Sequence, residues 1–165
     1  MDKTLPLRHS VLWPDMPLSH VRLPEDDFGT HYGAFLQDDA EPVAVISFFL
    51  EDVPIDKGME LQESNIITSL QCSGRAVRFR KFACAPQYHG KGIGTQLLLH
   101  SLSMSRSEEG ASVAWCDART STMEWYRKRG LRPFGTPFYK GRVEYNRMFL
   151  DLRDTEKNES LIAGS

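Results

Sequence analysis

The sequence is poor in cysteine and has no marked excess of charge of either sign. Cys72, Cys84 and Cys116 form no CxxC pair and cannot all pair within one chain. This excludes a disulfide scaffold and a four-cysteine zinc site, and it indicates a reducing compartment. Lysine and arginine number 20 against 22 aspartates and glutamates, a net charge of −2. A protein that coats nucleic acid is usually strongly basic, so no nucleic-acid partner is expected.

Long hydrophobic runs are also missing. The longest apolar stretch, Val43–Leu50, contains Ser47 and is far shorter than the ~20 residues that span a bilayer. The first residues lack the apolar core of a signal peptide. We therefore expect a cytoplasmic protein without a membrane partner.

The length and composition predict one globular domain. The chain has 165 residues, of which 41% are hydrophobic and 25% charged. A chain of this size buries about two thirds of its unfolded surface, enough for an unaided core. We expect a single domain over residues 1–152 and a frayed polar tail over residues 153–165.

Strand and helix patterns alternate after a proline-broken start. Apolar runs flanking a polar turn predict a hairpin of 31–36 with 43–50. The carboxylate-rich segment 51–72 is long for a loop, so it predicts a functional lid or a short helix. Ser121 and Glu124 match a capping box that starts a helix ending before Gly130. The remaining predictions are strands at 76–84, 112–116, 131–134 and 143–152 and a helix from 93 to 102.

A glycine-rich loop joins one predicted strand to a helix, with the pattern Gln87-x-x-Gly90-x-Gly92-x-Gly94. Backbone amides at a helix N-terminus form a cradle for phosphate, and Lys91 adds positive charge. The loop therefore predicts a pyrophosphate site. Gly94 is followed by Thr95-Gln96, so the loop is not a Walker motif, and its glycine spacing is not that of a dinucleotide fingerprint.

This loop closely resembles the acyl-CoA loop of the GNAT N-acetyltransferase superfamily. A later segment, Trp125-Tyr126-Arg127-Lys128-Arg129-Gly130-Leu131, resembles that family's [FW]-Y-x-x-x-G-[FL] segment. The resemblance covers roughly residues 28–152 and includes the order of the strands. It implies an α/β (α+β) fold: a mixed, twisted central sheet with splayed parallel strands, flanked by helices.

The resemblance also implies acetyl-CoA as co-substrate, with no metal. Backbone groups around Phe82, Ala83 and Cys84 would hold the pantetheine arm. Arg119 stands where relatives often have an asparagine that contacts the cofactor. The loop residues that would grip the pyrophosphate are Gln87, His89, Gly90, Lys91, Gly92, Ile93, Gly94 and Thr95.

The implied reaction is direct attack of a small molecule's primary amine on the thioester, with Tyr126 as general acid to the CoA thiolate. Lys81 stands where many relatives carry a glutamate, so the base stays open. Candidates are Glu51, Asp52, Asp117 or His31 acting through water, or bulk solvent.

Lys81 and Glu51 are expected to contact the acceptor, and Lys81 favours one that bears an anion. The alternatives are a protein lysine or N-terminal acetyltransferase and a non-catalytic acyl-CoA sensor. Both a monomer and a homodimer stay open.

Overall fold

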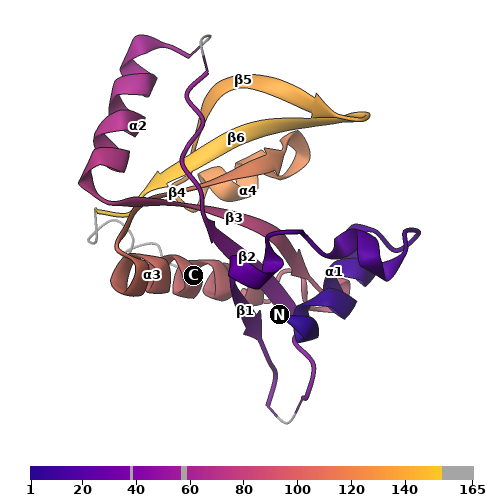
Figure 1. The fold of residues 1–165 in the computed structure, drawn as a ribbon. Coiled ribbons are helices and arrows are strands. Elements are labelled where there is room, and N and C mark those ends of the chain that lie inside the picture. Colours follow the sequence, from indigo (N-terminus) through magenta and orange to yellow (C-terminus); the bar gives the residue numbers. More distant parts are fainter. Residues whose placement is uncertain (38, 57–58, 154–165) are drawn as a thin grey trace. The chain divides into compact units, whose positions relative to one another are not determined.

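The computed structural model describes residues 1–37, 39–56 and 59–153. Six strands join in the order β1-β2-β3-β4-β6-β5; β3 runs parallel to β4, and the pairs β1/β2, β4/β6 and β5/β6 are antiparallel. The expected mixed α/β fold is therefore confirmed (Figure 1). The elements are α1 (Leu5–Leu12), β1 (Thr30–Ala34), β2 (Ala44–Leu50), α2 (Leu61–Ser73), β3 (Arg75–Cys84), α3 (Ile93–Glu109), β4 (Ala111–Arg119), α4 (Met123–Arg127), β5 (Arg132–Lys140) and β6 (Val143–Asp151), with 3-10 turns at Asp2–Thr4, Leu18–Val21, Asp26–Phe28, Pro86–Tyr88 and Thr120–Thr122.

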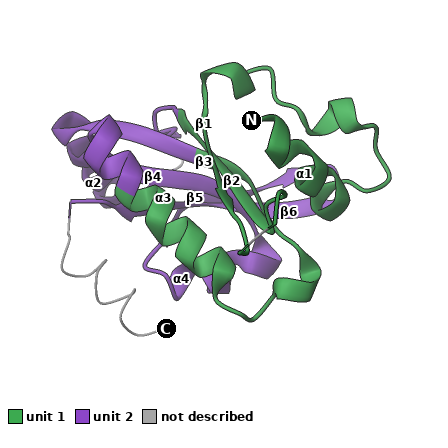
Figure 2. Cartoon of the chain, turned by 90° about the horizontal axis from the view of Figure 1, so that it is seen from below, with its two compact units in different colours: residues 1–49, 79–103 green, residues 50–78, 104–165 purple. Residues whose placement is uncertain are grey.

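The chain divides into two compact units that alternate along the sequence (Figure 2). Unit 1 comprises residues 1–49 and 79–103, and unit 2 comprises residues 50–78 and 104–165. Strand β3 and helix α3 each contribute residues to both units. Each unit is described separately below.

Unit 1 is built on the β1/β2 hairpin, which confirms the strand pair predicted from the sequence. Thr30 pairs with Phe48 and Ala34 with Ala44. The β2 residues up to Phe49 are buried, as expected of an apolar strand covered on both faces. The Phe48 and Phe79 rings lie 5.6 Å apart, and α3 adds the buried leucines 97, 98, 99 and 102.

A buried ion pair orders the proline-broken N-terminal segment of unit 1. Arg8 on α1 is fully buried, and its Nη1 donates to Asp26 Oδ2 at 2.8 Å. Arg8 Nη2 lies 2.5 Å from Ser47 Oγ and 3.2 Å from His31 Nδ1. The backbone amide of Leu23 also donates to Asp26. Because a buried charge is tolerated only when it is paired and hydrogen-bonded, this network fixes the segment.

Unit 2 is a helix packed on a three-stranded antiparallel face. Ile67 and Leu70 of α2 pack in one buried cluster with Trp115 of β4, Phe134 of β5 and Phe149 of β6. Ser112 Oγ donates to the Leu70 carbonyl at 2.5 Å. The segment 51–72 thus contains all but the last residue of the 13-residue helix α2, which is longer than the short helix that the sequence predicts as one of two possibilities.

The local prediction for α4 is wrong at its start and correct at its end. Thr122, not Ser121, precedes the helix, and the N-cap makes no side-chain hydrogen bond. The Thr122 hydroxyl instead donates to the Arg119 carbonyl at 3.0 Å. Gly130 adopts φ +85°, and the Leu131 amide donates to the Tyr126 carbonyl, so a left-handed glycine closes the turn after Arg127, the last residue of α4, as predicted. In the described residues no helix combines the length and apolarity needed to cross a bilayer.

Candidate active site

In unit 1 the glycine loop follows β3 directly and opens into α3. Gly90 and Gly92 have φ of +75° and +80°, which other L-residues rarely adopt. A Cβ added at either position would meet nothing within 4 Å, so the backbone conformation alone favours glycine there. Gly94 differs: a Cβ there would touch the Phe82 ring at 3.5 Å, an ordinary contact.

The backbone amides of the loop fall into two groups. His89 and Lys91 amides donate to the Pro86 and Tyr88 carbonyls at 3.1 and 3.4 Å. Within the described residues, no backbone hydrogen bond is donated by the amides of Gly90, Gly92, Ile93 and Gly94. These amides lie at the N-terminus of the 17-residue helix α3, a place where unpaired amides can bind a negatively charged group.

Side chains around the loop are arranged as follows. The His89 ring Nε2 lies 2.9 Å from the Cys84 carbonyl, so this carbonyl already has a partner within the chain. Lys91 Nζ lies 5.0 Å from the Tyr88 ring centroid and is exposed, as is Gln87. Among the residues proposed for the pantetheine arm, Ala83 is buried, whereas Phe82 and Cys84 are half-buried.

Lys81 lies at a break in the regular geometry of β3. It has φ +54°, alone among the described non-glycine residues in adopting a positive φ. Its Nζ lies 3.8 Å from the Trp13 ring centroid, a cation–π contact with the N-terminal segment. The neighbouring Arg80 donates to Glu25 at 2.6 Å, a second contact of this part of β3 with the N-terminal segment.

In unit 2, Tyr126 lies half-buried on α4. Burial raises its pKa well above that of free tyrosine, and the nearby Cys116 thiol adds to the effect. The hydroxyl is therefore protonated at neutral pH. The Trp125 ring meets the Tyr126 ring edge to face at 5.0 Å, and the Arg129 guanidinium lies 3.5 Å from the Trp125 centroid.

The other predicted site residues of unit 2 lie near the ends of strands. Glu51, just after β2, accepts a hydrogen bond from Arg78 at 2.7 Å, and its carbonyl accepts one from the Trp115 indole at 2.9 Å. Arg119 is exposed at the end of β4 and pairs in register with Tyr145 of β6. The predicted site residues thus belong to two different units. The glycine loop and Lys81 belong to unit 1, and Tyr126, Glu51 and Arg119 belong to unit 2.

Sequence reasoning missed most of a charged group around Asp117. Arg78 and Lys140 both donate to its carboxylate, at 2.5 and 2.7 Å, and Arg147 lies directly opposite it on β6. A charged residue in the mostly apolar strand β4 was the available signal, but its partners are up to 39 residues away in sequence.

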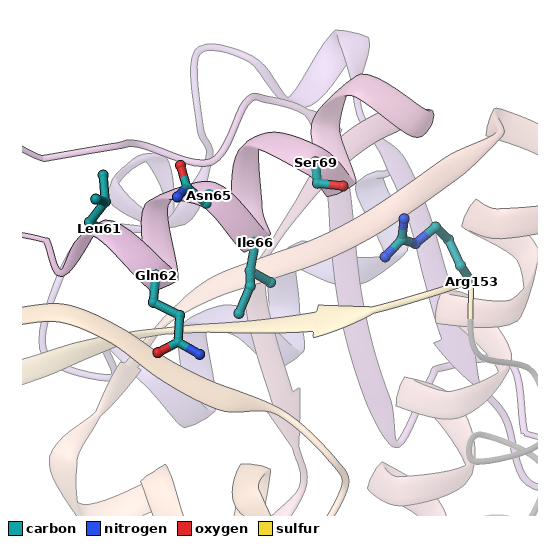
Figure 3. Close-up of a pocket in the computed structure, with 6 residues that line it drawn as sticks. All are labelled: Leu61, Gln62, Asn65, Ile66, Ser69 and Arg153. Atoms are coloured by element: carbon teal, nitrogen blue, oxygen red, sulfur yellow. The ribbon is translucent and has the colours of Figure 1, made fainter.

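Unit 2 also has an open groove. It has a volume of about 590 Å³ and runs along α2, with Arg153 at its end (Figure 3). Its lining consists of Leu61, Gln62, Asn65, Ile66, Ser69 and Arg153. None of the α2 side chains in it is an acid, a base or a strong nucleophile, so the groove offers no catalytic group for acyl transfer.

The described residues contain no group of three or more His, Cys, Asp or Glu side chains arranged to hold a metal ion.

Comparisons with known proteins point to one family. The model of the acetyltransferase (GNAT) family matches residues 4–131. An uncharacterized N-acetyltransferase of Bacillus subtilis (strain 168), YitI, is 26% identical over 140 residues, covering 84% of this chain and 82% of that protein.

Solved structures show the same fold at lower identity. A putative N-acetyltransferase from Lactobacillus plantarum superposes with a TM-score of 0.68 at 17% identity, covering 92% of this chain and 90% of its own. An aminoglycoside 6'-N-acetyltransferase complexed with coenzyme A gives a TM-score of 0.62 at 13% identity, with 92% and 89% coverage.

Proposed function

The chain belongs to the GNAT acetyltransferase family, and on that premise we propose that it transfers an acetyl group from acetyl-CoA to the primary amine of a small molecule. Membership makes it an acyltransferase that uses acyl-CoA; the acetyl donor and the small acceptor are proposed. The observation that carries the proposal is the left-handed glycine loop with unpaired amides at Gly90, Gly92, Ile93 and Gly94. Donors converging at a helix N-terminus suit the diphosphate of coenzyme A.

The proposed reaction balances without another reactant. The neutral amine attacks the thioester carbon, a C–N bond forms, and the C–S bond breaks. The ammonium loses two protons. One passes to solvent before attack, and the other makes up for the proton that the departing thiolate takes up. The products are the amide, the free CoA thiol and one released proton.

Tyr126 supplies the proton to sulfur in this proposal. Its raised pKa keeps it protonated at neutral pH, which a donor requires. A thiol with a pKa near 8.5 is a stronger acid than this tyrosine. Tyr126 therefore acts by sharing its proton as charge develops on sulfur, and not by completing the transfer beforehand.

The cysteines support direct attack over a cysteine acyl-enzyme. Burial raises the pKa of Cys84, and it raises that of Cys116 well above the usual value, with Asp117 adding to the effect. A thiol held in its protonated form is a poor nucleophile, since the thiolate is the reactive species.

Lys81, Glu51 and Arg119 complete the proposal. Lys81 and Glu51 contact the acceptor, and Arg119 contacts the cofactor. The chemistry of the side chains supports these roles: an ammonium or a guanidinium binds an anion, and a carboxylate binds an amine.

The test measures binding and turnover separately. Acetyl-CoA at 100 times its Kd stabilises a protein by about 2.7 kcal/mol, which corresponds to a rise of about 5–11 °C in Tm for a chain of this size. Release of free thiol from acetyl-CoA, measured across a panel of primary amines, reports turnover. No rise in Tm at millimolar acetyl-CoA contradicts the loop assignment. A rise in Tm without thiol release identifies a non-catalytic acyl-CoA sensor.

A further inference from the structure

The face of unit 2 that α2 covers continues along the strands into a charged stretch. In the register of β4 with β6, Trp115 pairs with Phe149 and, two residues on, Asp117 pairs with Arg147. Alternate residues of a strand share a face, so the aromatic pair under α2 and the charged pair beyond it lie on the same side. This face of the sheet therefore changes from apolar to charged between the two pairs.

Asp117 is the buried member of this charged stretch. Its side chain is only 9% exposed, and Oδ2 accepts from both Arg78 and Lys140. Oδ1 is buried and accepts no hydrogen bond from the described residues; the Arg147 Nε lies 3.9 Å away, beyond hydrogen-bond distance. A buried carboxylate oxygen without a donor is costly, so Oδ1 is a candidate acceptor for a ligand N–H.

The balance of charges in this stretch restricts the class of ligand that it can bind. The stretch holds three carboxylates and three cations, namely Glu51, Asp56 and Asp117 with Arg78, Lys140 and Arg147. A polyamine needs an excess of carboxylates, and a phosphate needs an excess of cations. A ligand with one ammonium and one carboxylate exchanges partners with these pairs and leaves the net charge unchanged.

The two ion pairs Lys140–Asp117 and Arg147–Asp56 can exchange partners readily. Lys140 is 50% exposed and Asp56 is 47% exposed, and exposed ion pairs contribute little to stability. Arg78 is different, because it is only 14% exposed and its guanidinium lies 4.5 Å from the Trp115 ring centroid. Arg78 therefore holds Asp117 in place, while Lys140 and Arg147 are available to a ligand.

An aromatic surface adjoins the available cations. The Phe138 and Tyr145 rings stack at 5.9 Å with an interplanar angle of 25°, and they pair directly between β5 and β6. Lys140 Nζ lies 4.8 Å from the Tyr145 centroid, and the Arg147 guanidinium lies 5.1 Å from that of Phe138. These rings offer apolar surface to the rest of a small ligand.

We propose that the acceptor is an amino acid or a close analogue whose amine donates to Asp117 Oδ1 and whose free carboxylate binds Lys140 and Arg147. The proposal rests on the proposed acetyl transfer and names its substrate class. Arg78 is a positioning residue, because it acts on the acceptor through Asp117.

The experiment compares acceptors that differ only in the carboxylate. Thiol release from acetyl-CoA is measured with glycine, L-methionine, L-phenylalanine and L-glutamate, with the corresponding α-amides, with the corresponding amines that lack the carboxylate, and with spermidine. At least one amino acid is expected to exceed its amide tenfold or more in kcat/KM. Equal rates for acid and amide, or a preference for spermidine, overturn the acceptor class and leave the acetyltransferase standing. No thiol release with any amine overturns the proposed function and this inference together.

Variants assign the preference to named residues. Arg147→Met and Lys140→Met should each lower kcat/KM for the amino acid about tenfold and bring it close to that of the amide. Asp117→Asn should raise KM for acid and amide alike, because it contacts the amine. Arg142→Met is the matched control: this exposed arginine of the β5–β6 turn should leave the acid-to-amide ratio unchanged. An unchanged acid-to-amide ratio in both the Arg147 and Lys140 variants overturns the carboxylate assignment. An unaltered Tm or acetyl-CoA affinity shows that a lower kcat/KM in a variant does not come from misfolding.

Discussion

Replacing Gly92 by alanine tests the glycine loop most directly. Gly92 has φ +80°, and a Cβ there meets nothing within 4 Å. The substitution therefore adds no clash, and its cost is the backbone preference alone, about 1–2 kcal/mol for an L-residue in the left-handed region. If the diphosphate binds only this loop conformation, the same free energy is lost from acetyl-CoA binding. Gly92→Ala should then weaken the affinity for acetyl-CoA about 5- to 30-fold.

Gly141→Ala is the control for this prediction. Gly141 lies in the β5–β6 turn with φ +61°, and a Cβ there also meets nothing within 4 Å. Its substitution carries a similar conformational cost but lies outside the loop. Titration calorimetry with CoA measures the affinity of both variants, and thermal unfolding measures their stability. Gly141→Ala should lose stability and keep its affinity. Gly92→Ala should lose affinity, because its free loop relaxes and must return to the left-handed conformation on binding.

Two outcomes of this comparison would refute the reasoning. If Gly92→Ala binds CoA as tightly as the unaltered chain, the left-handed loop does not hold the diphosphate. If Gly141→Ala loses as much affinity as Gly92→Ala, the loss reflects general destabilisation and not the loop.

Four further predictions follow from the contacts described above. Tyr126→Phe should lower kcat tenfold or more with little change in the Kd for acetyl-CoA, measured by thiol release and calorimetry; an unchanged kcat removes the hydroxyl from the chemistry. Lys81→Met should lower kcat/KM more for anionic acceptors than for neutral amines, and equal losses contradict its role at the acceptor. Arg8→Met leaves Asp26 buried without its cation, so the free energy of unfolding in a urea titration should fall by about 3–5 kcal/mol, and a change below 1 kcal/mol refutes the importance of the pair. Burial lowers the pKa of His31 below its ordinary 6.5, so on acidification the unfolded chain binds a proton before the folded chain does. The stability contributed by neutral His31 is therefore complete above pH 6.5 and falls as the pH drops below it. Between pH 7.5 and 5.0 the Tm should decline less steeply for His31→Gln than for the unaltered chain, and parallel curves contradict this.

Most of the correct fold predictions came from local sequence patterns. The β1/β2 hairpin, the β3–loop–α3 junction and the glycine that ends α4 were all predicted, because each depends on residues within a few positions of one another. The capping box at Ser121 failed for a related reason. The Thr122 hydroxyl bonds to Arg119 instead, and a spacing rule does not distinguish which of two adjacent hydroxyls precedes the helix.

The interior of segment 51–72 was harder to predict. Its helix α2 has weak amphipathic character in sequence, and only Ile67 and Leu70 are buried on it. The helix is stabilised by packing on Trp115 and Phe149, whose strands lie far along the chain. Tertiary packing of this kind outweighs local propensity.

The sequence by itself identified the family and led to the proposed roles of the glycine loop and of Tyr126, because those signals lie in short contiguous motifs. Only the tertiary structure decided which charges meet: Arg8 with Asp26 in unit 1, and Asp117 with Arg147 in unit 2. Charged side chains carry no local code for their partners, since Coulomb attraction depends on distance and burial in the folded chain. The acceptor assignment therefore depends on strand register, which places a buried carboxylate opposite an arginine.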